Sequence, residues 1–425
     1  MNRLRVNTGP VLGVSALWLT TRALMLWLLT HSDSPLLGAG TLALEVWQLY
    51  GRWYGVLAHG AFPAHDTLWQ YPPGASAVLL TPALLPWLTY FQAFVLLTLA
   101  VDALVTAALV RAGTRPGRSL LGAALWTGGL PLLLQLPLVR YDVQVTALAV
   151  LALLATARSP RAGGALAALG ALVKAWPALV LLGTPRGPVT RGAWRWAAAA
   201  GAVTLGLLAV LFRNPLSFLR QQRGRGVQIE SLGGTALNLA RHAGWPGRAR
   251  MQYGSAELVG PHVHAVALGC LVLTAACCAL LVVWRVRARR WTEATPFDAA
   301  LSAVLLFTVT SRVISPQYMI WLIGLAAVCL TSRHTSQRPV AALIVAASAL
   351  STLVFPMNYG EVMDGTWTGC LLMLARNGVL AAAAVLSFIR LWRAARAVEP
   401  VGKSLRTREP RSGSERFPDR AVSLS

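Results

Sequence analysis

Charged residues are scarce in this sequence of 425 amino acids. They make up 12% of the chain, whereas a soluble globular domain carries about 25%. Hydrophobic residues account for 56%, and they come in runs rather than in alternation. This composition excludes a soluble globular protein and also a disordered chain. It indicates one polytopic membrane domain that takes up nearly the whole sequence.

Acidic residues are the scarcest charged type, with 15 Asp and Glu against 38 Lys and Arg, so the formal net charge is +23. A basic balance can indicate binding to nucleic acid. Here, however, the arginines lie in short gaps between apolar runs and in the C-terminal tail, as is usual in membrane proteins. The basic segment 213–261 also lacks the interleaved aromatic residues of a nucleic-acid-binding surface. We therefore expect no nucleic-acid partner.

The motifs of several large enzyme classes are missing. The sequence contains no P-loop, no HExxH, no GxSxG and no dinucleotide-binding fingerprint. Its five cysteines lie mostly in apolar runs and have no metal-binding or redox spacing. None of these enzyme classes is indicated, and we expect no disulfide framework.

The sequence does have apolar segments of the length that a membrane helix needs, roughly 17–25 residues. We predict an all-α transmembrane bundle, with kinks or half-helices where Gly and Pro fall inside a span. Residues 1–390 form the predicted membrane domain, and 391–425 a basic, disordered cytoplasmic tail. The predicted spans are 11–30, 74–90, 92–111, 119–137, 142–157, 163–183, 194–212, 262–284, 296–313, 316–331, 339–355 and 368–390.

The distribution of arginine predicts the orientation of these spans. Arg285, Arg287 and the basic tail are expected inside, which places the segments 31–73, 213–261 and 356–367 outside. The same count puts the basic stretch 111–118 outside, against the rule, and either a re-entrant segment or a large-loop exception could explain that conflict. The two long outer loops, 31–73 and 213–261, are the expected sites of function, because long ordered loops beside a helical domain usually carry it.

The first long loop contains an amphipathic segment, 42–60. Trp47, Tyr50 and Trp53 recur in it at helical spacing, with Glu45 among its polar residues. We predict a helix in the plane of the membrane interface, because Trp and Tyr favour that layer. Such a helix could be a simple anchor, or it could hold Glu45 at the mouth of a lipid-facing cavity.

Two short motifs flank the next spans. The sequence WQYPPG at 69–74 includes Tyr71 and predicts a rigid extended turn before a helix. Arg140 and Asp142 stand two residues apart at a membrane boundary. They could form a pair with each other, or they could contact a substrate or a phosphate.

Lys174 is the strongest single feature of the sequence. It lies inside the otherwise uncharged span 163–183, where a lysine costs about 2.5–3.5 kcal/mol on insertion scales and is a functional candidate by default. Lys174 could form a buried ion pair with Asp142 or Asp102. Alternatively, its ammonium could bind a lipid phosphate as a point charge.

The turn 311–318 concentrates polar groups between two spans. Its sequence, SRVISPQY, combines Arg312 with two serines, Gln317 and a tyrosine. One fixed cation beside hydroxyl and amide donors makes a good cradle for an anion. The alternative is an ordinary short loop.

Taken in order along the chain, these segments resemble glycosyltransferase family 87 of the GT-C superfamily. The resemblance covers about residues 40–325, through the acid-bearing helix, WQYPPG, RYDVQVTALAVLALLA at 140–155, GALVKAWPALVLL at 170–182 and SRVISPQYMIWL at 311–322. Members of this family are integral membrane enzymes that use polyprenyl-phosphate sugars. The resemblance extends to actinobacterial members of the family, such as the mannosyltransferases of phosphatidylinositol mannoside assembly.

The resemblance implies an outward-facing site in which an acidic residue of the first loop is the general base. Glu45 occupies the position where the family usually has aspartate, and Asp66 is the fallback. Arg312 and Gln317 would hold the donor phosphate, and Lys174 and Arg140 would add to that site.

Tyr71 and Asp142 complete the expected substrate-binding set. The implied partners are a polyprenyl-phosphate-sugar donor, a lipid or glycan acceptor, and membrane lipids of the cell membrane. No DxD pair marks a metal site, so we expect no metal and no cofactor.

Two other classes of function compete with this interpretation. A secondary transporter or lipid flippase would also have about twelve spans and buried charges, but it should show two related halves. None is visible in the sequence. A non-catalytic relative of the enzyme is the other alternative, because Glu45 departs from the family's aspartate.

Overall fold

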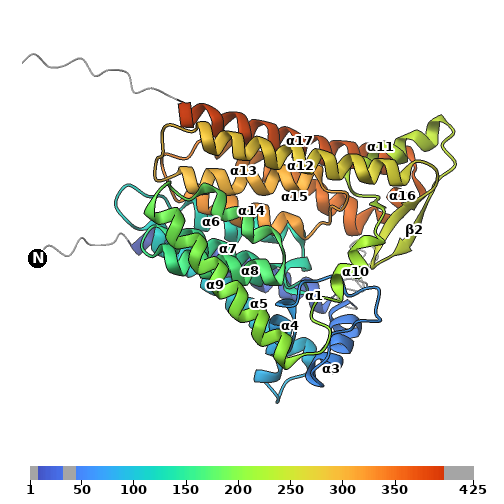
Figure 1. The fold of residues 1–425 in the computed structure, drawn as a ribbon, viewed down its shortest axis with the longest axis horizontal. Helices are drawn as coiled ribbons and strands as arrows, with labels where there is room; N and C mark the ends of the chain where they lie inside the picture. The colour runs from blue at the N-terminus through green and yellow to red at the C-terminus, as the bar shows by residue number, and fades with distance from the viewer. Residues whose placement is uncertain (1–7, 32–44, 397–425) are drawn as a thin grey trace, which may run out of the picture.

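The structure, a computed structural model, describes residues 8–31 and 45–396. It is a bundle of helices with one small sheet at one end (Figure 1). Within these described ranges, six helices are long and apolar enough to cross a membrane. They are α1 (Thr8–Thr30), α5 (Tyr90–Gly113), α9 (Pro188–Leu211), α12 (Val263–Arg287), α15 (Arg338–Thr352) with its π-helical continuation η7 (Leu353–Met357), and α17 (Trp367–Arg396).

Shorter apolar helices fill the middle of the bundle. They are α4 (Ala75–Leu80) with η2 (Thr81–Leu84), α6 (Leu121–Gly129) with η3 (Leu130–Leu133), α7 (Asp142–Thr156), α8 (Pro160–Val173), η5 (Trp176–Gly183), α13 (Thr295–Thr310) and α14 (Tyr318–Leu330). The predicted all-α polytopic bundle is therefore confirmed, although two of the predicted spans, 74–90 and 163–183, are not single continuous helices.

The outer surface of the bundle is apolar, as a lipid-facing surface must be. Helices α9 and α12 are the least buried of the long helices. On α9, Val203, Leu207 and Val210 follow one another at helical spacing and are all exposed. A wide exposed apolar face on a long helix is what a membrane solvates and water does not.

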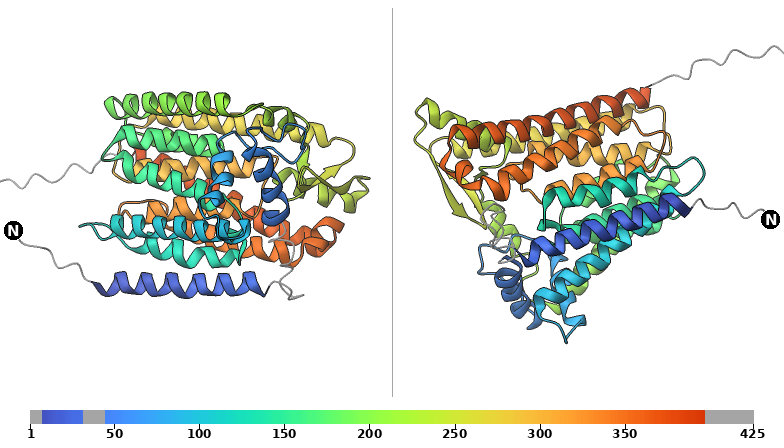
Figure 2. Two further views of the ribbon diagram at one scale, coloured as in Figure 1. Left: turned by 90° about the horizontal axis from the view of Figure 1, so that it is seen from below. Right: turned by 180° about the vertical axis from the view of Figure 1, so that it is seen from behind.

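The small elements gather at one end of the bundle, away from the described start of α1 and the end of α17 (Figures 1 and 2). They are η1 (Glu45–Tyr50), α3 (Gly51–Ala58), α10 (Phe218–Arg223), α11 (Leu232–Ala240), η6 (Arg241–Ala243) and α16 (Tyr359–Asp364), with the strands β1 (Val227–Gln228), β2 (Arg248–Gln252) and β3 (Ser255–Val259). The strands form an antiparallel sheet in the order β1-β3-β2.

The two long loops meet at this end. The backbone N–H of Phe62 donates to the carbonyl of Arg213 at 3.0 Å, and Gln70 Nε2 donates to the carbonyl of Tyr253 at 3.2 Å. The placement of 31–73 and 213–261 at one common end, expected from the arginine distribution, therefore appears in the described parts of both loops.

The amphipathic segment packs on the bundle at this end. Tyr50 and Trp53 are almost fully buried, and their rings contact Phe94 and Trp69 at centroid distances of 5.6 and 5.1 Å. Trp47, on another face, is 72% exposed. The aromatic stripe thus anchors η1 and α3 to the helices beneath them.

The predicted span 74–90 does not cross the bundle. Its helical part, Ala75–Leu84, is only ten residues long. The chain then reverses direction. The evidence is a hydrogen bond from the hydroxyl of Tyr90, at the start of α5, to the carbonyl of Leu79 at 3.1 Å. Helix α5 therefore begins near α3 and ends at the opposite end, where Arg118 pairs with Glu293 at 2.8 Å. The stretch 111–118 therefore lies at the opposite end of the bundle from the two long loops. The conflict in the arginine count arises from counting 74–90 as a full span.

The predicted span 163–183 is two elements and not one. Helix α8 ends at Val173, and Lys174 has extended φ/ψ angles of −151° and 133° before η5 begins. The physical reason is Pro177. A proline ring clashes with the carbonyl of the residue four positions earlier, which here is Val173, so a continuous helix is not possible.

Helix α1 is tied to the bundle by a buried ion pair. Arg22 Nη2 lies 2.7 Å from Asp102 Oδ1, and Arg22 Nε lies 2.7 Å from Oδ2. The indole N–H groups of Trp18 and Trp126 donate to the same carboxylate at 2.6 and 2.8 Å. Asp102 is thus a structural partner of Arg22 and not of Lys174.

The end of the chain differs from the predicted boundary. Helix α17 continues through Arg396, so residues 391–396 are helical. The remainder of the predicted tail lies outside the described residues.

Candidate functional site

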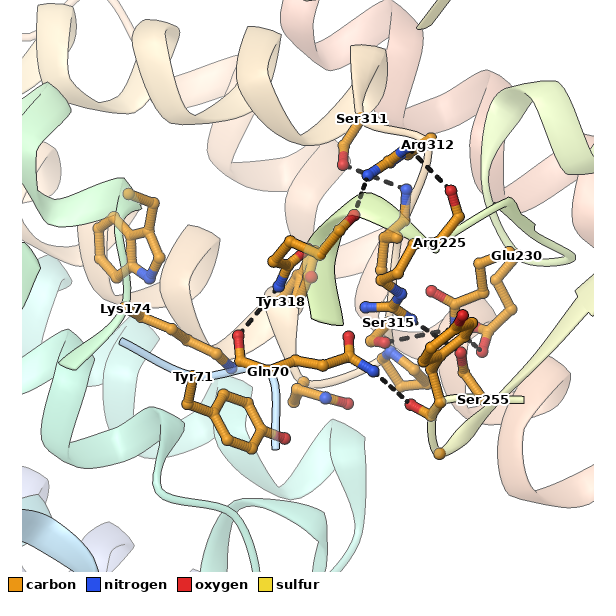
Figure 3. Close-up of a pocket in the computed structure, with 18 of the residues that line it drawn as sticks. Gln70, Tyr71, Lys174, Arg225, Glu230, Ser255, Ser311, Arg312, Ser315 and Tyr318 are labelled. Atoms are coloured by element: carbon orange, nitrogen blue, oxygen red, sulfur yellow. Dashed lines mark hydrogen bonds between the residues drawn. The ribbon is translucent and has the colours of Figure 1, made fainter. Parts of the chain in front are cut away.

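A cavity of about 740 Å³ opens at the end of the bundle where the two long loops meet. Its wall is assembled from segments far apart in the sequence (Figure 3). They are 68–72, the break between α8 and η5, the loop 218–255 and the turn 311–318, with further side chains from α12, η7 and α16. Only folding brings these segments together, so the cavity is a product of the tertiary structure.

The WQYPPG turn places Tyr71 at the cavity. The N–H of Gly74 donates to the carbonyl of Leu172 at 2.8 Å, which docks the turn onto the last residues of α8. A Cβ at position 74 would lie 2.7 Å from that carbonyl, so this approach requires glycine. Tyr71 consequently lies beside Lys174, whose Nζ is 5.9 Å from the centre of its ring.

Lys174 lies at the helix break and lines the cavity. Its Nζ is 2.6 Å from Asp142 Oδ1, and Trp321 Nε1 donates to the same oxygen at 2.6 Å. The ion pair with Asp142 that the sequence left open is therefore present. Asp142 itself is buried behind Lys174 and is not part of the wall.

Aromatic rings surround the Lys174 ammonium. Its Nζ lies 5.0 Å from the ring centres of Tyr141 and Trp321 and 5.7 Å from that of Tyr318. These distances are within the range of cation–π attraction, which stabilises an ammonium that has lost water. The break thus presents a fixed, partly desolvated cation to the cavity.

The turn 311–318 forms the next part of the wall. All of its residues except the buried Ile314 line the cavity. Arg312 Nη1 and Nη2 donate to the carbonyls of Arg225 and Gln222 at 2.9 and 2.8 Å. These bonds fix the guanidinium and use two of its five N–H donors. Gln317 is half-buried on the same wall.

Arg225 is a cavity residue that sequence reasoning missed. Its Nε pairs with Glu257 at 3.1 Å, and its Nη2 donates to Ser255 Oγ at 2.9 Å. Burial and the nearby Arg225 both lower the pKa of Arg312, although an arginine stays charged at neutral pH. The guanidinium groups of Arg225 and Arg312 are near enough for each charge to act on the other, and such a pair favours an anion between or beside them.

Arg140 is buried and also lines the cavity, so four cationic side chains of the described residues line it: Arg140, Lys174, Arg225 and Arg312. Three of the four were candidates from the sequence. The fourth, Arg225, lies in a loop that carries several other arginines, and nothing in its spacing distinguishes it from them. Such a set of fixed cations can bind a phosphate and stabilise charge that develops on it.

Glu230 is the one carboxylate among the described residues that line the cavity, and sequence reasoning did not select it. Its Oε2 lies 3.1 Å from Arg376 Nη2. Burial raises the pKa of Glu230 to about 7, and the Arg376 guanidinium opposes that rise. Figure 3 places Glu230 and Ser255 at one side of the cavity, with Lys174 and Tyr71 at the other.

The two acidic residues expected to act as base lie in the first loop. Glu45 begins η1, but its side chain lies outside the described part of the structure. Asp66 accepts hydrogen bonds from Trp53 Nε1 and from the N–H of Leu68, both at 2.9 Å, and lies 3.8 Å from Arg52. Its side chain braces the loop and is not part of the described cavity wall.

Fold and site together define a multi-pass membrane protein with a cationic cavity at one end of its helical bundle. The sequence model of glycosyltransferase family 87 matches residues 69–316, more than half of the chain. The matched segment contains all four cavity cations. The chain therefore belongs to glycosyltransferase family 87, and it is a membrane glycosyltransferase. No match was found among curated proteins or among solved structures.

Proposed function

We propose that this enzyme transfers a sugar, mannose in the first instance, from a polyprenyl-phosphate donor to a lipid or glycan acceptor. The observation that carries the proposal is the cavity wall with Arg140, Lys174, Arg225 and Arg312. When a sugar leaves polyprenyl phosphate, a phosphodiester becomes a monoester and gains negative charge. Fixed cations stabilise that charge without reorganising at the moment of reaction.

A lipid donor is supported by the position of the cavity next to the lipid-facing surface. Leu271 of α12 lines the cavity and is 50% exposed, and its neighbours Leu268 and Val272 on the same helix are exposed as well. Phe307, on the neighbouring helix α13, lines the cavity as well. A prenyl chain could therefore run from the cavity along α12 into the membrane without its apolar surface entering water.

We assign the general base to Glu45. The π-helix that it begins ends at Tyr50, whose ring lies 5.8 Å from that of Tyr141, and Tyr141 lies 5.1 Å from Tyr71. This chain of rings supports a base on the Tyr71 side of the cavity. The carboxylate would take the proton of the acceptor hydroxyl as that oxygen attacks the anomeric carbon and polyprenyl phosphate leaves. Such a base contributes about 10²- to 10⁴-fold.

The reaction would take place on the outer face of the cell membrane. The cavity is at one end of the bundle, whereas Arg285 and Arg287 lie in the last turn of α12, at its far end, and Arg289 and Arg290 follow that helix. Arginines of short loops remain on the cytoplasmic side in most membrane proteins.

A transfer assay tests the proposal. Purified protein in detergent receives radiolabelled polyprenyl-phosphate mannose and a membrane lipid extract, in parallel with Glu45→Gln and Arg312→Ala. We expect labelled lipid product from the wild type, no product from Glu45→Gln, and strongly reduced transfer from Arg312→Ala. Normal transfer by Glu45→Gln would refute the base assignment. Folded wild-type protein that forms no product from mannose, arabinose or glucose donors would refute the proposed function.

A further inference from the structure

Glu230 is held in place by a rigid frame. The N–H of Ile229 donates to the carbonyl of Ala256 in β3 at 2.9 Å, and Ser231 caps α11 through a bond from the N–H of Gly234 at 2.9 Å. The carbonyl of Glu230 accepts bonds from Arg376 and Asn377 of α17, both at 3.1 Å. The backbone at position 230 is therefore fixed from both sides and from the helix behind it.

The carboxylate of Glu230 keeps acceptor capacity at the cavity. Its Oε2 is engaged by Arg376, but Oε1 accepts only a long contact of 3.5 Å from Gln228 Nε2. Ordinary N–H···O bonds measure about 2.7–3.2 Å. The same Gln228 amide donates to Ser315 Oγ at 3.4 Å, and its own Oε1 is a buried acceptor without a hydrogen-bond partner.

The two sides of the cavity thus differ in chemistry. Lys174 lies on one side and Glu230 on the other, with Arg225 and Arg312 nearer to Glu230 than Lys174 is (Figure 3). A phosphate is attracted to the cations and repelled by a carboxylate. A hydroxyl group, by contrast, can donate to Glu230 and Gln228, and bonds to a charged acceptor are the stronger kind.

The proposed reaction determines which hydroxyl groups can reach the side of the cavity where Glu230 lies. The transferred sugar is bonded directly to the phosphate, so its ring must lie beside the cations. The acceptor is expected at the base on η1, across the cavity near Tyr71. We propose that Glu230, with Gln228 beside it, binds a hydroxyl group of the transferred sugar and determines which sugars the enzyme accepts. This inference rests on the proposed function.

The test uses polyprenyl-phosphate mannose and its four monodeoxy analogues as donors, with the full-length enzyme in detergent. We measure kcat/KM for every donor with the wild type and with Glu230→Gln. The wild type should lose roughly 10- to 100-fold with the analogue that lacks the contacted hydroxyl, because a bond to a charged acceptor disappears. With the parent donor, kcat/KM of Glu230→Gln should fall by a similar factor. For this variant, removing the contacted hydroxyl group from the donor should cause no further loss, whereas removing any of the other three should affect it as it affects the wild type.

Two further variants serve as a backup and as a control for this test. Glu230→Asp keeps a charge for Arg376 while withdrawing the carboxylate by one methylene, and it should show the same position-selective pattern if Glu230→Gln fails to fold. Asp298→Asn is the matched control, because Asp298 is a buried carboxylate away from the cavity wall that accepts from Thr335 at 2.6 Å. Its profile across the five donors should equal that of the wild type.

Equal losses by the Glu230 variants on all five donors would overturn the inference and leave Glu230 a purely structural partner of Arg376. A rise in the KM of the acceptor alone would overturn it as well. If the wild type uses none of the mannose, arabinose and glucose donors, the proposed function fails and this inference fails with it. Turnover of any one of these parent donors shows that the proposed function holds, and the deoxy analogues of that donor then test this inference alone.

Discussion

The ammonium of Lys174 and the carboxylate of Asp142 lie 2.6 Å apart, although 32 residues separate them in the chain. Lys174 lines the cavity, and Asp142 is buried behind it and also accepts the N–H of Trp321. Lys174 faces the cavity, and Asp142 fixes the position of its ammonium group. The pair therefore has a structural role and a proposed catalytic role that mutations can separate.

Lys174→Met should destabilise the protein by about 3–5 kcal/mol, because it leaves Asp142 buried and uncompensated. The double variant Lys174→Met/Asp142→Asn removes that charge and keeps an acceptor for Trp321. We expect it to recover thermal stability in detergent but to remain roughly 10²- to 10³-fold slower in transfer, because the cation at the leaving phosphate is still missing. Recovery of transfer in the double variant would show that Lys174 acts only through stability.

Gly74→Ala should weaken the docking of the WQYPPG turn. The added Cβ would lie 2.7 Å from the carbonyl of Leu172, and relieving this overlap costs about 1–3 kcal/mol. Because Tyr71 moves with the turn, we expect the KM of the donor to rise. Gly55→Ala in α3 is the matched control, since nothing lies within 4 Å of its Cβ, and it should leave donor KM unchanged.

Arg22→Met should destabilise the membrane bundle without changing the chemistry at the cavity. It breaks a pair in which both side chains are 3% exposed, at a cost of about 3–5 kcal/mol. Arg22→Met/Asp102→Leu should regain most of that loss, because no charge then remains buried. Melting temperature measured beside kcat per folded molecule tests this, and a fall in kcat would contradict an exclusively structural role for α1.

Glu230 predicts a pH dependence of stability. Burial raises the pKa of Glu230 to about 7, above the value of about 4.3 for an unfolded glutamate. Between these values the folded state binds more protons than the unfolded state, so stability falls as pH rises. We expect melting temperature to drop between about pH 5 and pH 7 in the wild type, and this part of the drop to disappear in Glu230→Gln. An identical pH profile in both proteins would count against it.

Much of the fold could be predicted from hydrophobicity, because each membrane helix must be apolar over its own length. The break at Lys174 could have been predicted too, since Pro177 excludes a helix through Val173. The re-entrant Ala75–Leu84 could not be distinguished from a true span by composition. Only its short length and the contact between Tyr90 and Leu79 reveal it.

In the candidate site, too, some residues could be predicted from the sequence and others could not. Arg312 and Lys174 were identified because polar residues stand out within apolar sequence. Arg225 and Glu230 lie in a polar loop, where an arginine or a glutamate is ordinary. Their significance comes from partners far away in the sequence, Arg312 for one and Arg376 for the other, and no local pattern encodes those contacts.

The contact between Glu230 and α17 has a consequence for the minimal functional length of the chain. The segment matched by the family model ends at residue 316, yet Arg376 and Asn377 hold the peptide at position 230 from a helix that starts 51 residues later, at Trp367. Phe355 and Tyr359 also belong to the cavity wall. A protein truncated after the shared segment would keep Arg140, Lys174, Arg225 and Arg312 but lose the helix that supports the Glu230 carboxylate. Homology alone therefore marks a boundary inside the functional unit.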